Sequence, residues 1–160
     1  LDEQSRYMYL SGARQFEGLG LYELVRRRCS VILVSDAEAD PGYSMRALSQ
    51  AVLMCRTDFG IEVEIDVSGI EKDPDTGKSR DHFAVGRIRY DRVDPGAAAG
   101  TLIYWKPSLT GDEPLEVEAL HKTNPTFPHE PARDQRFAEE RFESYRSLGE
   151  HIALSVFGGR

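Results

Sequence analysis

The segment VILVSDAEADPGYSMRALSQAVLMC, from Val31 to Cys55, contains the clearest pattern in the chain. Its first four residues form a continuous apolar, mostly β-branched run, which is typical of a strand buried on both faces. A polar loop follows. The apolar residues then recur every three or four positions, as on one face of an amphipathic helix: Met45, Leu48, Val52 and Cys55. The segment therefore predicts a strand, a loop and a helix in this order.

The preceding residues repeat this order. Tyr7–Leu10 is predicted to be a short strand and Ser11–Gly18 a loop, and the spacing of the leucines predicts a helix over Leu21–Arg28. Three consecutive arginines close that helix, where cations favour the helix dipole. Two strand–helix units in succession predict that residues 1–60 form an α/β portion, with parallel strands and flanking helices.

Residues 61–106 have a different period. Over residues 61–67 the apolar side chains alternate with acidic ones, and 81–90 and 101–105 also read as strands, so this portion is predicted to be an antiparallel β meander. We expect Glu62 and Glu64 to pair with Arg87 and Arg89 across the sheet. A cation site formed by the two glutamates is the less favoured alternative.

Residues 107–160 are predicted to be a proline-punctuated loop followed by a long C-terminal helix on the surface of the sheet. The positions expected to face the protein step by three and four residues: Ala138, Phe142, Tyr145, Gly149, Ile152 and Val156. Residues 1–160 are expected to form one region.

Composition excludes several classes of protein. The formal net charge of −7 disfavours a nucleic-acid binder, which needs clustered Lys and Arg. No run reaches the roughly 20 apolar residues of a membrane-spanning helix, and the first residues lack the apolar core of a signal peptide. We therefore expect a cytoplasmic location by default. The chain lacks an initiator Met and a strand-like run begins almost at once, so we also expect it to be part of a longer protein, which could associate with membranes.

Motifs for cofactors and metals are weak. Gly77-Lys78-Ser79 lacks the earlier glycine of a phosphate-binding loop, and Cys29 and Cys55 lack a CxxC spacing. The histidines are widely scattered, without the i, i+4 spacing of a helical zinc pair: His82, His121, His129 and His151. We predict surface or packing roles for all four, and neither a metal nor a cofactor.

One long string and six shorter ones carry a resemblance. The long string, YMYLSGARQFEGLGLYELVRR, covers Tyr7–Arg27. The shorter ones are VSDA (34–37) with DP (40–41), CRTDFG (55–60), HFAVG (82–86), KPSLTGDEP (106–114), FPH (127–129) and FESYR (142–146). In this order they resemble the C-terminal part of bacterial patatin-like phospholipases, a family of lipid acyl hydrolases. The resemblance covers nearly the whole chain.

That resemblance implies a partial patatin-like sheet and a Ser–Asp catalytic dyad, with the serine on an upstream elbow and the aspartate in an Asp-Gly-Gly motif. The chain departs from the family at that motif, because the aspartate falls on Gly12 and the glycines on Ala13 and Arg14. We therefore expect no catalytic residue in this chain. Gly12, Arg14, Glu17 and Asp36 are the candidate residues of a vestigial site. For Glu17 and Asp36, a helix-cap or salt-bridge role is favoured over catalysis. Arg14 is expected to pair with Glu17 or Asp36, or else to attract an anionic head group.

Three functions remain open. The first is the C-terminal portion of a patatin-like serine acyl hydrolase, a phospholipase or esterase of lipid metabolism that is inactive as this isolated chain. The second is a non-catalytic patatin-like scaffold that binds a protein or lipid partner. The third is a small α/β binding module without a link to lipids. The expected partners are the missing N-terminal half of the same fold or a second copy, and a lipid or membrane surface, but not nucleic acid.

Overall fold

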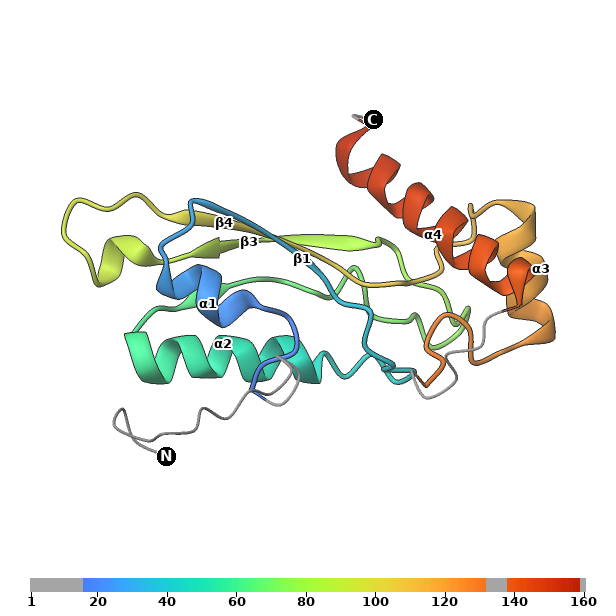
Figure 1. Cartoon of the computed structure of the whole chain (residues 1–160), viewed down its shortest axis with the longest axis horizontal. Helices are drawn as coiled ribbons and strands as arrows, with labels where there is room; N and C mark the ends of the chain where they lie inside the picture. The colour runs from blue at the N-terminus through green and yellow to red at the C-terminus, as the bar shows by residue number, and fades with distance from the viewer. Residues whose placement is uncertain (1–15, 132–137, 159–160) are drawn as a thin grey trace, which may run out of the picture.

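The computed structural model describes residues 16–131 and 138–158, and it shows an α/β protein built on one four-stranded mixed sheet (Figure 1). The strands are β1 (Val31–Ser35), β2 (Val63–Glu64), β3 (Phe83–Ile88) and β4 (Gly100–Trp105). The helices are α1 (Leu21–Arg26), α2 (Arg46–Phe59), α3 (Leu115–Thr123) and α4 (Glu139–Phe157), with a short 3₁₀ helix at Tyr90–Arg92. The predicted strand Tyr7–Leu10 lies outside the described residues.

The sheet joins both predicted portions of the chain, because its order is β1-β4-β3-β2. β1 and β4 are parallel, with Val31 opposite Thr101 and Ser35 opposite Trp105. β4–β3 and β3–β2 are antiparallel. The last strand of the predicted meander is therefore also the parallel neighbour of β1.

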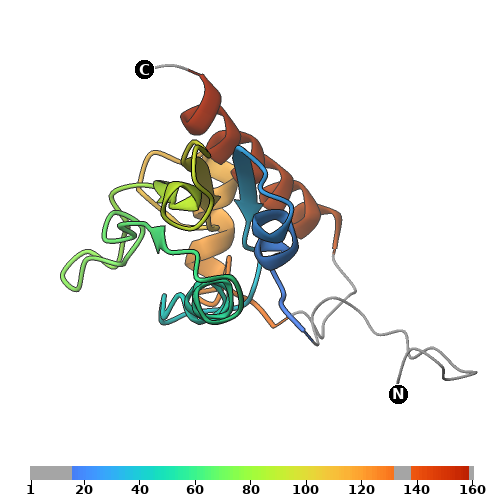
Figure 2. The same ribbon diagram turned by 90° about the vertical axis from the view of Figure 1, so that its left-hand side faces the viewer.

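Two cores stabilise the fold. The larger lies between the sheet and the helices α1 and α2, which run side by side on one face (Figures 1 and 2). The smaller lies where α4 packs on α3 beyond the ends of the strands, and it is formed by Val117, Phe127, Leu148 and Ile152. The long C-terminal helix was predicted, whereas α3 was not.

The buried face of α4 matches the predicted one in part, because Ile152 is buried and Tyr145 packs against the smaller core. Phe142 is exposed, and the buried residues are Ser144, Ser147, Leu148 and Ile152. The two serines are buried because their hydroxyls donate to nearby oxygens: Ser144 to the carbonyl of Glu140 and Ser147 to the Glu116 carboxylate. Hydrophobic spacing therefore predicted the helix and part of its buried face.

The acidic side of the first meander strand pairs with arginines, which confirms the expectation in part. Arg89 Nη1 lies 2.9 Å from Glu64 Oε1. Arg92, from the 3₁₀ helix, contacts Glu62 and Glu64. Sequence spacing predicted Arg89 and missed Arg92, whereas Arg87, the other expected partner, forms no ion pair with either glutamate among the described residues. The two glutamates thus serve as ion-pair partners.

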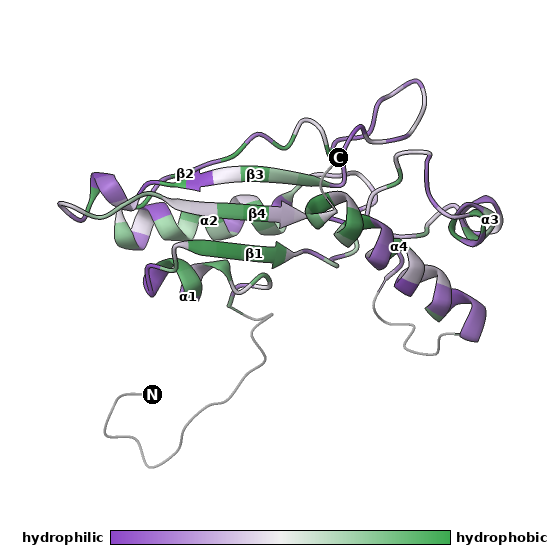
Figure 3. Ribbon diagram, turned by 90° about the horizontal axis from the view of Figure 1, so that it is seen from above, coloured by the Kyte–Doolittle hydropathy of each residue, from purple (hydrophilic) through white to green (hydrophobic). Residues whose placement is uncertain are grey.

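The prediction that β1 is buried on both faces is wrong. Ile32 and Val34 face the core, but Val31 and Leu33 on the other face are 62% and 44% exposed. Val85 of β3 lies on the same face and is 58% exposed. Figure 3 looks onto this face, on which β1 and parts of β3 and β4 are apolar. β1 is also the end strand of the described sheet, so an apolar face continues to an open edge.

We expect this face to bind hydrophobic dyes and to promote self-association. The double change Leu33→Lys with Val85→Lys should reduce dye fluorescence to about half or less, because lysines disrupt the continuous apolar patch. Dye titration and sedimentation would measure both effects. The matched control is Leu53→Lys with Leu115→Lys, which changes two exposed leucines on helices. Equal effects of the two pairs would contradict a role for the sheet face.

No helix in the described parts of the chain has the length and apolar character needed to cross a membrane.

Candidate functional site

The carboxyl ends of β1 and β4 place two charged residues side by side. Asp36 directly follows β1, and Lys106 directly follows β4. Because the strands are parallel and Ser35 is opposite Trp105, the two side chains meet at the same edge of the sheet. Lys106 Nζ lies 3.0 Å from Asp36 Oδ2, and each side chain is only 1% exposed. The carboxyl ends of parallel strands are the usual position of sites in α/β proteins.

Further groups complete a buried polar network around this ion pair. The Tyr104 hydroxyl donates to Asp36 Oδ2 at 2.6 Å, and the Glu38 N–H donates to Asp36 Oδ1 at 2.9 Å. Burial, together with the hydrogen bond to Asp36, raises the pKa of Tyr104 far above its ordinary value. The hydroxyl therefore stays protonated and serves as a donor. Asp36 thus has partners on both carboxylate oxygens.

Asp40 connects the network to α2. Its Oδ2 lies 3.7 Å from Lys106 Nζ, and its carboxylate accepts bonds from the backbone N–H groups of Ser44 and Met45 at 3.0 Å each. Burial opposes ionisation of Asp40. The hydrogen bonds from Ser44 and Met45 and the charge of Lys106 outweigh it, so the pKa of Asp40 is lowered. Asp40 thus fixes the turn just before the helix and places a negative charge near its N-terminus.

His129 packs beside this network in a neutral form. Its Nδ1 accepts the N–H of Asp40 at 3.4 Å, and its ring lies edge-on to Tyr43, with 4.7 Å between the ring centroids. Nε2 is buried without a hydrogen-bond partner among the described residues. Burial and the positive charges of Lys106 and Lys72 lower the pKa of His129 to about 4.

This histidine should make the protein less stable in mild acid. Between the unfolded pKa of about 6.5 and the folded value of about 4, the unfolded chain binds a proton that the folded chain does not. Stability should therefore fall with decreasing pH, and His129 should contribute about 1.4 kcal/mol per pH unit in this window. His129→Gln should flatten the slope in chemical denaturation at several pH values. An unchanged slope would show that His129 is not neutral in the folded state.

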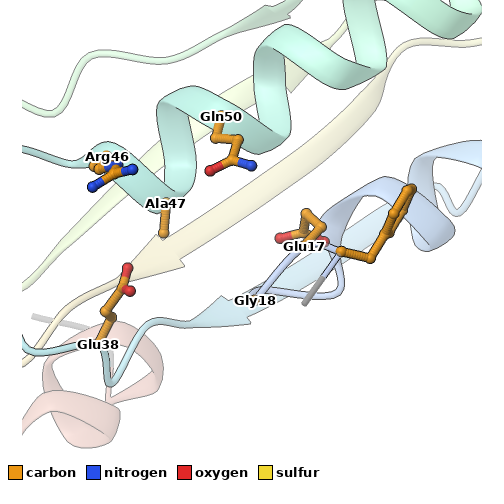
Figure 4. Close-up of a pocket in the computed structure, with 7 residues that line it drawn as sticks. Glu17, Gly18, Glu38, Arg46, Ala47 and Gln50 are labelled. Atoms are coloured by element: carbon orange, nitrogen blue, oxygen red, sulfur yellow. The ribbon is translucent and has the colours of Figure 1, made fainter. Parts of the chain in front are cut away.

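Two adjoining pockets lie next to this end of the sheet. One, of about 250 Å³, is lined by Phe16, Glu17, Gly18, Glu38, Arg46, Ala47 and Gln50. The other, of about 270 Å³, shares Gly18, Glu38 and Ala47 with it and reaches Asp36 and Ser35. Figure 4 shows Glu17 and Glu38 on opposite sides of the first pocket. Glu17 lines the first pocket and Asp36 the second, so these two candidate residues lie in adjoining pockets.

The Glu17 carboxylate is bound to backbone N–H groups at the start of α1. The side chain is buried, and its carboxylate accepts the N–H of Leu19 at 2.6 Å and that of Tyr22 at 3.3 Å. Among the described residues that line the two pockets, Ser35 carries the only hydroxyl, and Ser35 is exposed. Glu17 and Asp36 thus have the cap and salt-bridge roles. The described part of the site contains no serine activated by a base.

The other two candidate residues, Gly12 and Arg14, lie outside the described residues. The pairing of Arg14 with Glu17 or Asp36 stays a prediction. Sequence reasoning missed Lys106, Tyr104 and Asp40. Lys106 directly follows a predicted strand, which was the available signal, but that strand was assigned to an antiparallel meander and not placed beside β1.

Comparisons with protein-family models, with curated proteins and with solved structures gave no match to this chain.

Proposed function

We propose that this chain is the C-terminal portion of a patatin-like serine acyl hydrolase, a phospholipase or esterase of lipid metabolism, and that it is inactive as an isolated chain. The observation that carries the proposal is the position of the two pockets, at the carboxyl ends of parallel strands and beside Glu17 and Asp36. An α/β hydrolytic site would occupy this place. The proposed dyad position, Gly12, is only four residues before Phe16 in the sequence, and Phe16 lines the first pocket.

Inactivity of the chain follows from the chemistry of ester hydrolysis. Acyl transfer needs a nucleophile in contact with a base. Of the three carboxylates that line the pockets, two are already held by hydrogen bonds, Glu17 by backbone N–H groups and Asp36 by Lys106 and Tyr104, and the third, Glu38, is exposed. Gly12 has no side chain to accept a proton. The serine would have to come from a segment outside this chain.

The exposed sheet face supports the proposal that a second segment of the same fold packs on it. Val31, Leu33 and Val85 form an apolar surface next to the open edge of β1. An N-terminal half carrying the serine would cover this surface and complete the sheet. The same surface is what favours the second candidate, a non-catalytic patatin-like scaffold that binds a protein or lipid partner.

A reversion experiment separates the two candidates. In the parent open reading frame, with the upstream half included, the triple change Gly12→Asp, Ala13→Gly and Arg14→Gly restores the family's Asp-Gly-Gly motif. We expect esterase activity on short acyl-nitrophenyl esters, which a serine-directed phosphonate abolishes. The matched control has Gly12→Asn in place of Gly12→Asp. It should stay inactive because an amide cannot serve as the base.

Two results would count against the hydrolase proposal. One is a folded revertant with an upstream Gly-x-Ser-x-Gly that gains no activity, which would leave the scaffold. The other is phosphonate-sensitive hydrolysis by the unmodified chain alone. We expect that chain to hydrolyse the same esters no faster than a heat-denatured sample.

A further inference from the structure

A second cluster of polar side chains lies away from the pockets, where the start of β3 meets α4. His82 directly precedes β3, Asp112 and Glu113 belong to the loop before α3, and His151 lies on α4. One ligand atom from each of the four residues lies within 4.8 Å of the others. The two imidazole rings meet edge to face, with 5.2 Å between their centroids. The fold thus brings together two histidines that lie far apart in the sequence.

We propose that His82, Asp112, Glu113 and His151 bind one divalent transition-metal ion of the zinc type, as a structural site. Four protein ligands leave no open position, which distinguishes a structural zinc site from a catalytic one. The site is independent of the proposed hydrolase function. It replaces the expectation, drawn from the spacing of the histidines, that the chain binds no metal.

The orientation of His82 supports this assignment. The Ser108 hydroxyl lies 3.0 Å from His82 Nδ1 and donates to the Asp81 carbonyl at 3.3 Å. We assign the Ser108 proton to the Asp81 carbonyl, so that Ser108 accepts the Nδ1–H of His82. The lone pair is on Nε2, the nitrogen on the other side of the ring, 3.2 Å from Thr110 Oγ1. A hydrogen bond from the outer ring nitrogen is the arrangement that fixes metal-binding histidines.

The negative charge gathered around the Thr110 hydroxyl also favours a cation. The Thr110 hydroxyl lies 3.2 Å from His82 Nε2, 2.5 Å from Asp112 Oδ1 and 3.1 Å from Glu113 Oε1. Glu113 Oε1 also accepts the backbone N–H of Thr110, and Asp112 Oδ1 also lies 3.1 Å from His151 Nε2. Glu113 and His82 are both buried, so their electron pairs converge in a place with restricted access to water. A cation among these groups would neutralise the two carboxylates and bind the Nε2 lone pair of His82.

The geometry needs only small adjustments. Bonds of about 2.0–2.2 Å in a tetrahedron place the ligand atoms about 3.3–3.6 Å apart. His151 Nε2 and Asp112 Oδ1 are already 3.1 Å apart. Glu113 is held in place by the backbone N–H of Gly111 at 2.9 Å. The remaining separations are at most 4.8 Å and must shorten by up to about 1.5 Å, which side-chain rotation of the exposed Asp112 and of His151 allows.

The ligand set selects the class of ion. Two imidazole nitrogens and two carboxylates suit Zn²⁺ and the similar ions Co²⁺ and Ni²⁺. Ca²⁺ and Mg²⁺ prefer oxygen ligands alone. A pocket of about 170 Å³ beside His82, Asp112 and His151 gives the ion a path from solvent. A bound ion would tie α4 and the loop before α3 to the edge of the sheet.

The test uses the whole chain after treatment with a chelator. Zn²⁺ at about 100 times its dissociation constant should raise the Tm by about 5–10 °C, and Co²⁺ should give the intense visible absorption of a tetrahedral site. Titration calorimetry should give one ion per chain. Ca²⁺ and Mg²⁺ at the same concentration should leave the Tm unchanged.

Two variants at the more accessible ligands locate the site. His151→Gln and Asp112→Asn should each weaken Zn²⁺ binding by about 100-fold or more. The matched controls, His121→Gln and Asp75→Asn, should bind like the original chain. The proposal fails if Zn²⁺ gives no shift, if both ligand variants bind like their controls, or if only Ca²⁺ or Mg²⁺ stabilises the chain.

Discussion

The change Lys106→Met is expected to lower the free energy of unfolding by about 3–5 kcal/mol, because it leaves the Asp36 carboxylate buried without its cation. Asp36 and Lys106 are each 1% exposed, so water does not replace the lost partner. Thermal and urea denaturation would measure the loss. The control is Lys122→Met, which removes an exposed lysine paired with Glu118 at 3.5 Å and should cost less than about 1 kcal/mol.

The double variant Lys106→Met with Asp36→Asn tests the cause. Asparagine keeps an acceptor for the Tyr104 hydroxyl and removes the charge, so most of the lost stability should return. If Lys106→Met is no more damaging than Lys122→Met, or if the double variant is as unstable as the single one, the buried charge is not what destabilises the protein.

The second large effect concerns the smaller core. Leu148→Ala should destabilise the protein by about 2–5 kcal/mol, because it leaves a cavity between α4 and α3. Leu154→Ala on the same helix is the matched control. Leu154 is 63% exposed and Leu148 only 1%, so the control should change stability by less than about 0.5 kcal/mol. Equal losses in the two variants would contradict the observed orientation of α4.

The local pattern of the sequence predicted most elements but not their neighbours. The run at Val31–Val34 predicted β1, but four apolar residues in a row do not show which face is covered. Their burial alternates because the described chain covers one face only. The run at 101–105 likewise predicted β4, but its parallel pairing with β1 depends on residues far away in the sequence.

The candidate site, too, was predictable only where its residues depend on the local sequence. The positions of Asp36 and Glu17 after a strand and before a helix indicated their structural roles. Lys106 and the contact between His82 and His151 were not predictable, because they depend on how distant segments pack. Spacing rules for histidines apply within one helix, whereas these two lie on different elements.

The pairing of β1 with β4 has a consequence for the order of folding. β3 and β4 pair across the short segment between Ile88 and Gly100, whereas Asp36 and Lys106 are separated by 70 residues. Closing the longer loop costs more chain entropy, and a polar pair that must lose its water gains nothing until the strands are aligned. The β3–β4 hairpin can therefore form early and act as a template. β1 would then join as a late step, which the ion pair completes.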